Sequence, residues 1–280
     1  MMKDFPLVIF TIMQQMATGG FVLLALFLLI KSIKQPNSLQ LSKWFIVIII
    51  LSGLALMTST LHLGHPLRGA NVLFGLGRSW LSNEVIITGL FFGSVGSYWL
   101  LSWQFPDWTT LRQVSLVVGL LSGLAGLAAM SLTYMIYTVP VWDSWHTPAS
   151  FFSTAITAGS LLALLLLQPI PAAFSGRAKP IIHFIGVIGL ISCALVMGMQ
   201  AQHWGGISSA ITTPAEQFPG YATWMLIRAA LLLVTALVWL ATLFTNNRSP
   251  MTLLQTLVLV LIAEGIGRVV FYGVHMTAGL

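Results

Sequence analysis

The sequence predicts an all-α, polytopic membrane protein, a bundle of about eight transmembrane helices. Of its 280 residues, 57% are hydrophobic and only 6% are charged, and the mean hydropathy is +0.93. Because a soluble domain carries about 25% charged residues, most of this surface must face lipid. Each span needs roughly 20 apolar residues, so eight spans nearly use up the chain. We therefore expect one integral membrane domain over residues 1–280.

Apolar stretches of suitable length are separated by prolines and polar residues. The expected spans are residues 5–30, 44–64, 84–103, 113–136, 150–170, 180–201, 222–245 and 251–275. The first stretch is too long for the core of a signal peptide and has no convincing small-residue cleavage site, so we expect it to be the first span.

The basic residues predict the orientation of these helices. If the N-terminus lies on side one, that side holds only Lys3, Arg68 and Arg78. Side two then holds seven basic residues: Lys31, Lys34, Lys43, Arg112, Arg177, Lys179 and Arg248. Cytoplasmic loops carry the excess of Lys and Arg, so we expect side two to be cytoplasmic and both termini to face outside. The same scattered residues account for the pI of about 9.8, and we expect no nucleic-acid partner.

Cysteine and glycine usage limits the chemistry and indicates the packing. The single cysteine, Cys193, excludes an internal disulfide, a CxxC zinc site and an iron–sulfur cluster held by this chain. The pairs Gly89/Gly93 and Gly119/Gly123 have the GxxxG spacing that predicts close packing of helices.

Titratable residues gather near one membrane face. The residues at or beyond the outer ends of spans are His62, His65, His146, His203, His275, Asp4, Glu84, Asp143 and Glu216. A site for proton chemistry would gather them, but outer loops that contact a partner would do so too. Both interpretations stay open on this distribution alone.

One constellation lies between the second and third spans. The run from Leu61 to Arg68 includes His62 and His65, and Glu84 follows at the expected start of the third span. A helix N-terminus favours a carboxylate, and Ser82 or Asn83 is a plausible cap. The alternative is a capped helix without a chemical role.

A second constellation lies in the last span, where Glu264, Arg268, Tyr272 and His275 are offset by 4, 8 and 11 residues. This spacing places them within about 80° of arc on one helix face. We expect Glu264 and Arg268 to pair inside the bundle, which leaves open whether the pair is structural or functional. Polar residues expected in the same interior are Arg228, Gln14 and Gln15.

Apart from its histidines, the sequence contains no set of residues that would bind a cofactor. A b-type haem would need two histidines at matching depth, for which His62 and His275 are conceivable. A quinone site needs less: a His, Glu or Tyr that reaches a ring oxygen, an apolar slot and a proton path. The outer residues supply each of these.

Over essentially its whole length the chain resembles the membrane anchor subunits of bacterial dimethyl sulfoxide reductases. The passages that carry this resemblance are Pro6 to Thr11 with Gln15, Gly19-Gly20-Phe21, Leu61-His62-Leu63-Gly64 with Pro66 and Arg68, Ser82-Asn83-Glu84, Thr138-Val139-Pro140, and the closing run from Glu264 to Thr277.

The resemblance implies an eight-helix anchor in the bacterial inner membrane, with both termini periplasmic. It implies menaquinol as the bound substrate, with no haem or iron–sulfur cluster in this chain. The implied partners are a four-cluster iron–sulfur subunit and a molybdopterin catalytic subunit, which holds a molybdenum bis-pterin. It assigns quinol oxidation to His62 and Glu84. His65 departs from the small polar residue that is more usual in the family, so either histidine remains a candidate for contacting the quinol.

The leading hypothesis is a menaquinol-oxidising anchor subunit that passes electrons to an iron–sulfur partner and does not itself reduce the S-oxide. The residues expected to bind quinol or to support its site are His65, Arg68, Gln15, Glu264, Arg268, Tyr272 and His275. The alternatives are a purely structural anchor and, third, a secondary transporter or proton channel. Transport would favour inverted repeats and interrupted helices in both halves, and neither is clear in the sequence.

Overall fold

The computed structural model describes residues 5–30, 37–61, 66–170, 177–244 and 249–277. Within these ranges, eight helices are long and apolar enough to cross a membrane. They are α1 (Phe5–Leu29), α2 (Asn37–Leu61), α3 (Trp80–Gln104), α4 (Thr109–Thr133), α5 (His146–Leu166), α7 (Ala178–Gly205), α9 (Tyr221–Phe244) and α10 (Pro250–Gly273). The shorter elements are the 3₁₀ helix η1 (Pro66–Gly75) and α8 (Pro214–Gln217). The predicted all-α membrane fold is confirmed.

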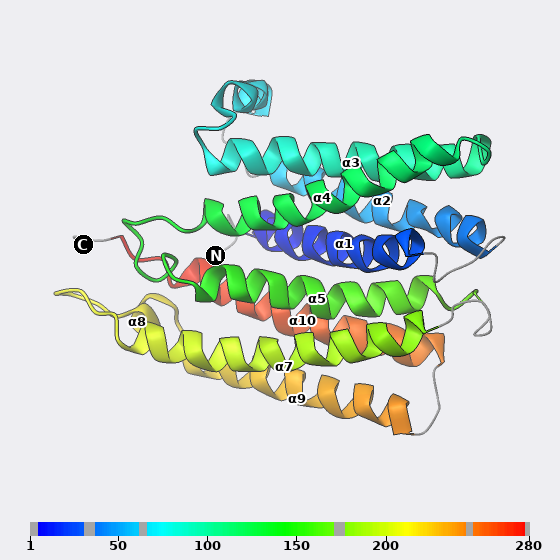
Figure 1. The fold of residues 1–280 in the computed structure, drawn as a ribbon. Coiled ribbons are helices and arrows are strands. Elements are labelled where there is room, and N and C mark those ends of the chain that lie inside the picture. The colour runs from blue at the N-terminus through cyan, green and yellow to red at the C-terminus, as the bar shows by residue number, and fades with distance from the viewer. Residues whose placement is uncertain (1–4, 31–36, 62–65, 171–176, 245–248, 278–280) are drawn as a thin grey trace.

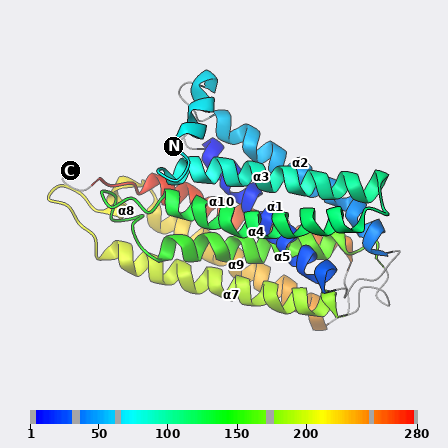
Figure 2. The same ribbon diagram turned by 45° about the horizontal axis from the view of Figure 1, so that its top comes forward.

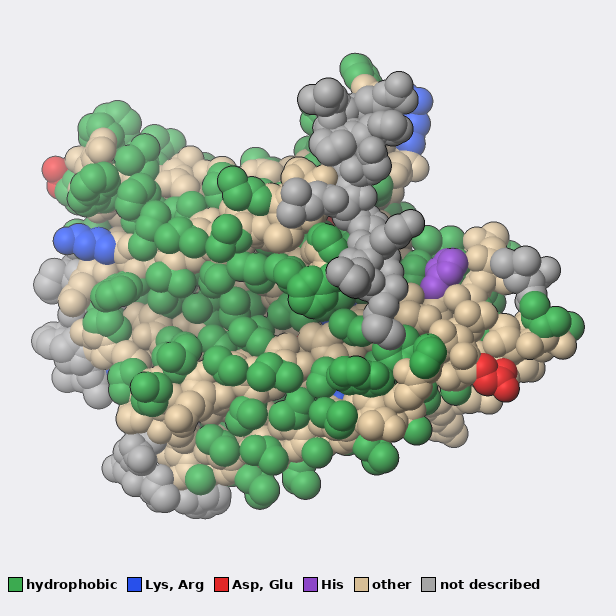
Figure 3. Space-filling model, turned by 180° about the vertical axis from the view of Figure 1, so that it is seen from behind, with side chains coloured by type: hydrophobic (Ala, Val, Ile, Leu, Met, Phe, Trp, Pro, Cys, Tyr) green, Lys and Arg blue, Asp and Glu red, His purple; other side chains and the backbone are tan. Residues whose placement is uncertain are grey.

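The eight long helices form one elongated bundle, and the start of α1 lies at the same end of it as the end of α10 (Figure 1). We call this the terminal end; it also carries η1, α8 and the connection from α4 to α5. In both ribbon views η1 projects from the bundle beside α2 and α3 (Figure 2). On the face seen in Figure 3, apolar side chains run along the length of the bundle and charged ones stand mainly near its two ends, as a lipid environment requires.

Helices α1 and α5 form the centre of the bundle. Burial inside the protein is highest in these two, at 67% of the apolar window of α1 and 78% of that of α5. Their backbones touch where Gly19 meets Ala155 and Gly159. A β-carbon on Gly159 would lie 2.5 Å from the carbonyl carbon of Gly19, so no larger residue fits at this crossing.

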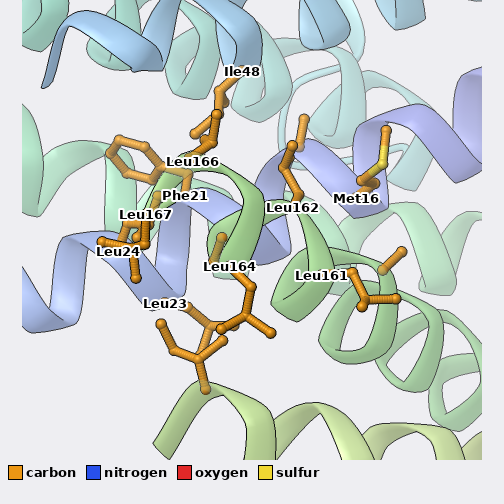
Figure 4. Packing of buried hydrophobic residues seen from close by; sticks show 14 of the residues in the cluster. Met16, Phe21, Leu23, Leu24, Ile48, Leu161, Leu162, Leu164, Leu166 and Leu167 are labelled. Atoms are coloured by element: carbon orange, nitrogen blue, oxygen red, sulfur yellow. The ribbon is translucent and has the colours of Figure 1, made fainter. Parts of the chain in front are cut away.

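Apolar side chains fill the layer around this crossing. Figure 4 shows Met16, Phe21, Leu23 and Leu24 of α1 packed with Ile48 of α2 and with leucines of α5 and its end: Leu161, Leu162, Leu164, Leu166 and Leu167. The ring of Phe21 makes edge contacts with Phe45 and Phe91, with centroids 5.5 and 5.4 Å apart. These contacts join α2 and α3 to α1.

The two glycine pairs behave differently. A β-carbon on Gly119 of α4 would lie 2.8 Å from the ring of Phe21, and one on Gly123 would lie 3.0 Å from Thr18 and 3.1 Å from Phe91, so close packing at this pair is confirmed. The expectation was wrong for Gly89 and Gly93, because a β-carbon at either would meet no atom of the described residues within 4 Å. The reason is that α3 packs on its neighbours through another face, which carries Ser82, Glu84, Thr88, Phe91, Ser94, Val95 and Tyr98.

Candidate functional site

Glu84 is a buried carboxylate in the terminal half of α3. Its side chain is 2% exposed, and its Oε1 has no hydrogen-bond partner among the described residues. Thr133, at the end of α4, lies beside it. A buried polar atom without a partner is unfavourable, so this oxygen requires a hydrogen-bond donor.

The start of α3 differs from the expected one. The helix begins at Trp80 with Ser79 as its N-cap, so Glu84 lies in the second turn, where the helix dipole acts weakly. Neither Ser82 nor Asn83 caps the helix, and Asn83 Oδ1 instead accepts a hydrogen bond of 2.8 Å from the backbone N–H of Gly77. Gly77 has φ = 76°, and this left-handed residue turns the chain into α3 earlier than the sequence pattern indicated.

Two tyrosines connect the region of Glu84 with α10. Tyr134 caps the C-terminus of α4, and its ring centroid lies 5.4 Å from that of Tyr272. The Tyr272 hydroxyl is buried beside Tyr134 and Thr11, but it is in hydrogen-bonding geometry with no described residue. Burial raises the pKa of Tyr134 well above its ordinary value, and the neighbouring Tyr272 and Glu84 raise it further. Tyr134 is therefore a neutral phenol at physiological pH.

The predicted ion pair between Glu264 and Arg268 is wrong. Glu264 Oε1 instead accepts a hydrogen bond of 3.0 Å from Arg228 Nη2 of α9, and its Oε2 accepts one of 2.5 Å from Thr154 of α5. Arg228 reaches Glu264 because Gly267 leaves space for its guanidinium. The expectation that Arg228 belongs to the same interior is confirmed.

Arg268 points to α1 and α5. Its Nη1 lies 3.3 Å from Ser150 Oγ and its Nη2 lies 3.4 Å from Gln15 Oε1. Its guanidinium carbon also stands 3.6 Å from the ring centroid of Phe151, a cation–π contact. Gln15 thus belongs to this interior, as expected.

The other residues that the sequence predicted for the site have no described contact with Glu264 or Arg268. α10 ends at Gly273, so His275 leaves the helical face on which the offsets placed it; it is exposed, with its ring centroid 4.7 Å from that of Trp142. His62 and His65 lie outside the residues that the structure describes, as does the side chain of Arg68.

A cavity of about 230 Å³ opens beside Tyr272 at the terminal end. It lies between α1, α10 and the segment that follows α8, and it is lined by Val8, Gln217, Phe218, Pro219, Val269, Tyr272 and Gly273. The described residues include no group of three or more His, Cys, Asp or Glu side chains placed to hold a metal ion.

Comparison with known proteins identifies the family. Residues 1–274 match the family model for the DMSO reductase anchor subunit (DmsC). The protein belongs to this family. It is 35% identical to the C subunit of the anaerobic dimethyl sulfoxide reductase of Escherichia coli (strain K12), over 99% of this protein and 96% of that one. Identity is 31% to the anaerobic dimethyl sulfoxide reductase subunit YnfH of the same strain. It is 32% to the C subunit of the Haemophilus influenzae enzyme (strain ATCC 51907 / DSM 11121 / KW20 / Rd), and both alignments again cover 99% and 96%.

The fold of this DMSO reductase anchor subunit thus brings Glu84, Tyr134, Tyr272 and Arg268 together from α3, α4 and α10. Sequence reasoning missed Tyr134, although its place at the end of α4 gives it a depth similar to that of Glu84 at the start of α3. A buried carboxylate, two buried phenols and a buried guanidinium are able to bind hydroxyl groups and to accept and donate protons.

Proposed function

We propose that this anchor subunit oxidises menaquinol and passes the electrons to an iron–sulfur subunit of a respiratory S-oxide reductase. A molybdopterin subunit of the same complex would reduce the substrate. The proposal is supported by the family of the protein, by relatives that are subunits of anaerobic dimethyl sulfoxide reductases, and by the buried polar residues in the terminal half of the bundle.

The observation that carries the proposal is the Glu84 carboxylate. It is buried, one of its oxygens has no partner among the described residues, and it lies close to the terminal end of α3. A hydroxyl of a quinol ring is a donor that suits this oxygen. Tyr272, whose hydroxyl also lacks a described partner, is the second group that a bound ring could reach.

Quinol oxidation releases two electrons and two protons, so the site needs proton acceptors beside the ring hydroxyls. His62 accepts a proton from one hydroxyl or hydrogen-bonds to it, because an imidazole with a reference pKa of about 6.5 binds and releases protons near neutrality. Glu84 passes protons to the outer surface, and the positive charge of Arg68 influences the charge state of the Glu84 carboxylate. The apolar tail stays in lipid or in an apolar groove.

The quinol docks where α2, α3 and α10 reach the terminal end, and Gln15, Arg268 and Glu264 support the site from the interior. The electrons leave directly to the partner, whose iron–sulfur clusters supply the further redox chemistry. We place the terminal end at the periplasmic face of the inner membrane, in agreement with the distribution of basic residues. Quinol oxidation and substrate reduction would then occur on one side, and little net proton translocation is expected.

The test uses His62→Ala and Glu84→Gln in complexes that still assemble, with the exposed Asp107→Asn as a control. Reduction of the S-oxide by quinol should collapse in the first two variants, whereas reduction driven by an artificial dye that feeds the soluble subunits should persist. Activity that survives His62→Ala but fails in His65→Ala would move the contact to His65. Full quinol activity in all of these variants would leave a purely structural anchor as the better account.

A further inference from the structure

A second, smaller cavity lies inside the bundle where α5, α7, α9 and α10 meet. It measures about 10 Å³ and is lined by Ser150, Gln200, Arg228, Glu264, Gly267, Arg268 and Phe271. Neither Glu84 nor Tyr272 lines it, but Glu264 and Arg268, which support the proposed quinol site from the interior, line this cavity as well. A cavity needs roughly 10–15 Å³ to hold one water molecule, so this one has the size for a single small occupant.

Three hydrogen-bond donors around this cavity have no partner among the described residues. They are Nε of Arg228, Nε of Arg268 and Nε2 of Gln200. The three residues are 5%, 3% and 3% exposed, so bulk water does not solvate these groups. Leaving one such donor unpaired costs about 1–3 kcal/mol, and three at one place require an explanation.

The side-chain oxygens of Glu264 and Ser150 in the same cavity already have partners. Both oxygens of Glu264 accept hydrogen bonds, from Arg228 and Thr154. Ser150 Oγ donates to the carbonyl of Thr147 and lies 3.3 Å from Arg268 Nη1. The three hydrogen bonds of Arg268 are long, at 3.3, 3.4 and 3.5 Å.

The charges around the cavity do not cancel. Two guanidinium groups and one carboxylate line it, and the carboxylate is paired with only one of the two cations. A buried cation without full compensation is strongly unfavourable. A hydrogen-bond acceptor between Arg228, Arg268 and Gln200 would satisfy the unpaired donors. An acceptor there would also stabilise the excess positive charge.

We propose that this cavity binds one small hydrogen-bond acceptor, a water molecule or a halide ion, held by Arg228, Arg268 and Gln200. A water molecule matches the volume, and it can donate a hydrogen bond to Glu264 while it accepts from two of the donors. A halide matches the three unpaired donors and the excess positive charge. The occupant fixes the guanidinium of Arg268, which otherwise has only long hydrogen bonds. This inference does not depend on quinol oxidation.

A density map of the purified complex, sharp enough to show buried waters, gives the decisive test. We expect one isolated peak within hydrogen-bond distance of the two Nε atoms and of Gln200 Nε2. Replacing chloride by bromide distinguishes the two occupants, because only a halide site gains anomalous signal in crystals. The proposal is overturned if the cavity is empty in a map that resolves other buried waters, or if the density continues into a lipid tail or a quinone ring.

A variant pair tests the chemistry of the site in solution. Gln200→Glu adds a carboxylate that satisfies the guanidinium groups itself, and Gln104→Glu makes the same change at the exposed end of α3. If the occupant is a halide, the thermal midpoint of the wild type and of Gln104→Glu is higher in chloride than in gluconate, and Gln200→Glu loses this difference. If it is water, no protein shows the difference and the peak remains without anomalous signal.

Discussion

The guanidinium of Arg228 lies directly against the backbone of Gly267: a β-carbon at position 267 would stand 2.5 Å from Cζ and 2.7 Å from Nε of Arg228. The absence of a side chain on α10 is therefore what lets a cation of α9 reach Glu264.

This contact predicts opposite effects for two neighbouring glycines of α10. Gly267→Ala should push Arg228 away from Glu264 and lower the free energy of unfolding of the complex by about 1–3 kcal/mol. Gly265→Ala is the control, because its β-carbon would meet only Ile12 at 3.8 Å, and it should be neutral or stabilising by about 0.5–1 kcal/mol. The thermal midpoints of the two purified variants check this. Equal midpoints would contradict the close contact at Gly267.

The ion pair between α9 and α10 predicts a non-additive mutant cycle. Arg228→Gln leaves the Glu264 carboxylate buried without its cation and should cost about 3–5 kcal/mol. The double variant Arg228→Gln with Glu264→Gln removes both charges and should recover part of this loss. The amount of assembled complex in membranes, together with its thermal midpoint, measures the coupling. Additive losses would mean that the two side chains do not interact.

Tyr134→Phe keeps the aromatic packing and removes only the hydroxyl near Glu84. If the proposed site is correct, assembly should be unchanged while quinol-dependent turnover falls at least about tenfold and dye-driven reduction persists. Tyr137→Phe, at an 88% exposed position in the same connection, is the matched control. Unchanged quinol kinetics in Tyr134→Phe would remove this residue from the site.

The raised pKa of Tyr134 also predicts the pH dependence of that variant. A phenol whose pKa is raised stays protonated below that pKa. Tyr134 therefore remains a neutral hydrogen-bond donor from about pH 6 to 9. The rate profile of Tyr134→Phe over this range should thus be scaled down without a change in shape. A profile that loses one of its limbs would show that Tyr134 itself titrates there.

The distribution of basic residues predicts the orientation of the bundle. Alkaline phosphatase fused after Leu280 should be active, since we expect it in the periplasm, and a fusion near Lys34 should be inactive. The reverse pattern would place the proposed site at the cytoplasmic face.

The sequence was sufficient to predict a membrane protein and to predict that Arg228 and Gln15 lie in the interior of the bundle. Polar side chains within apolar spans are unfavourable toward lipid, so they face the other helices. The sequence was insufficient for the partner of Glu264. Spacing along one helix indicated Arg268, whereas the choice depended on Gly267 and on the approach of α9. The position of Tyr134 near Glu84 and the exposure of Gly89 and Gly93 likewise depend on which sides of the helices pack together. Spacing within a single span does not specify this.

The contact between Gly19 and Gly159 has a consequence for biosynthesis. The two glycines are 140 residues apart in the sequence, and synthesis at about 5–20 residues per second separates their insertion by roughly 7–28 s. During that interval α1 stays in the bilayer without its main neighbour, and Gln14 is able to bond Thr18 on its own helix at 3.0 Å. The helix that enters the membrane first is thus enclosed only after more than half of the protein has been made.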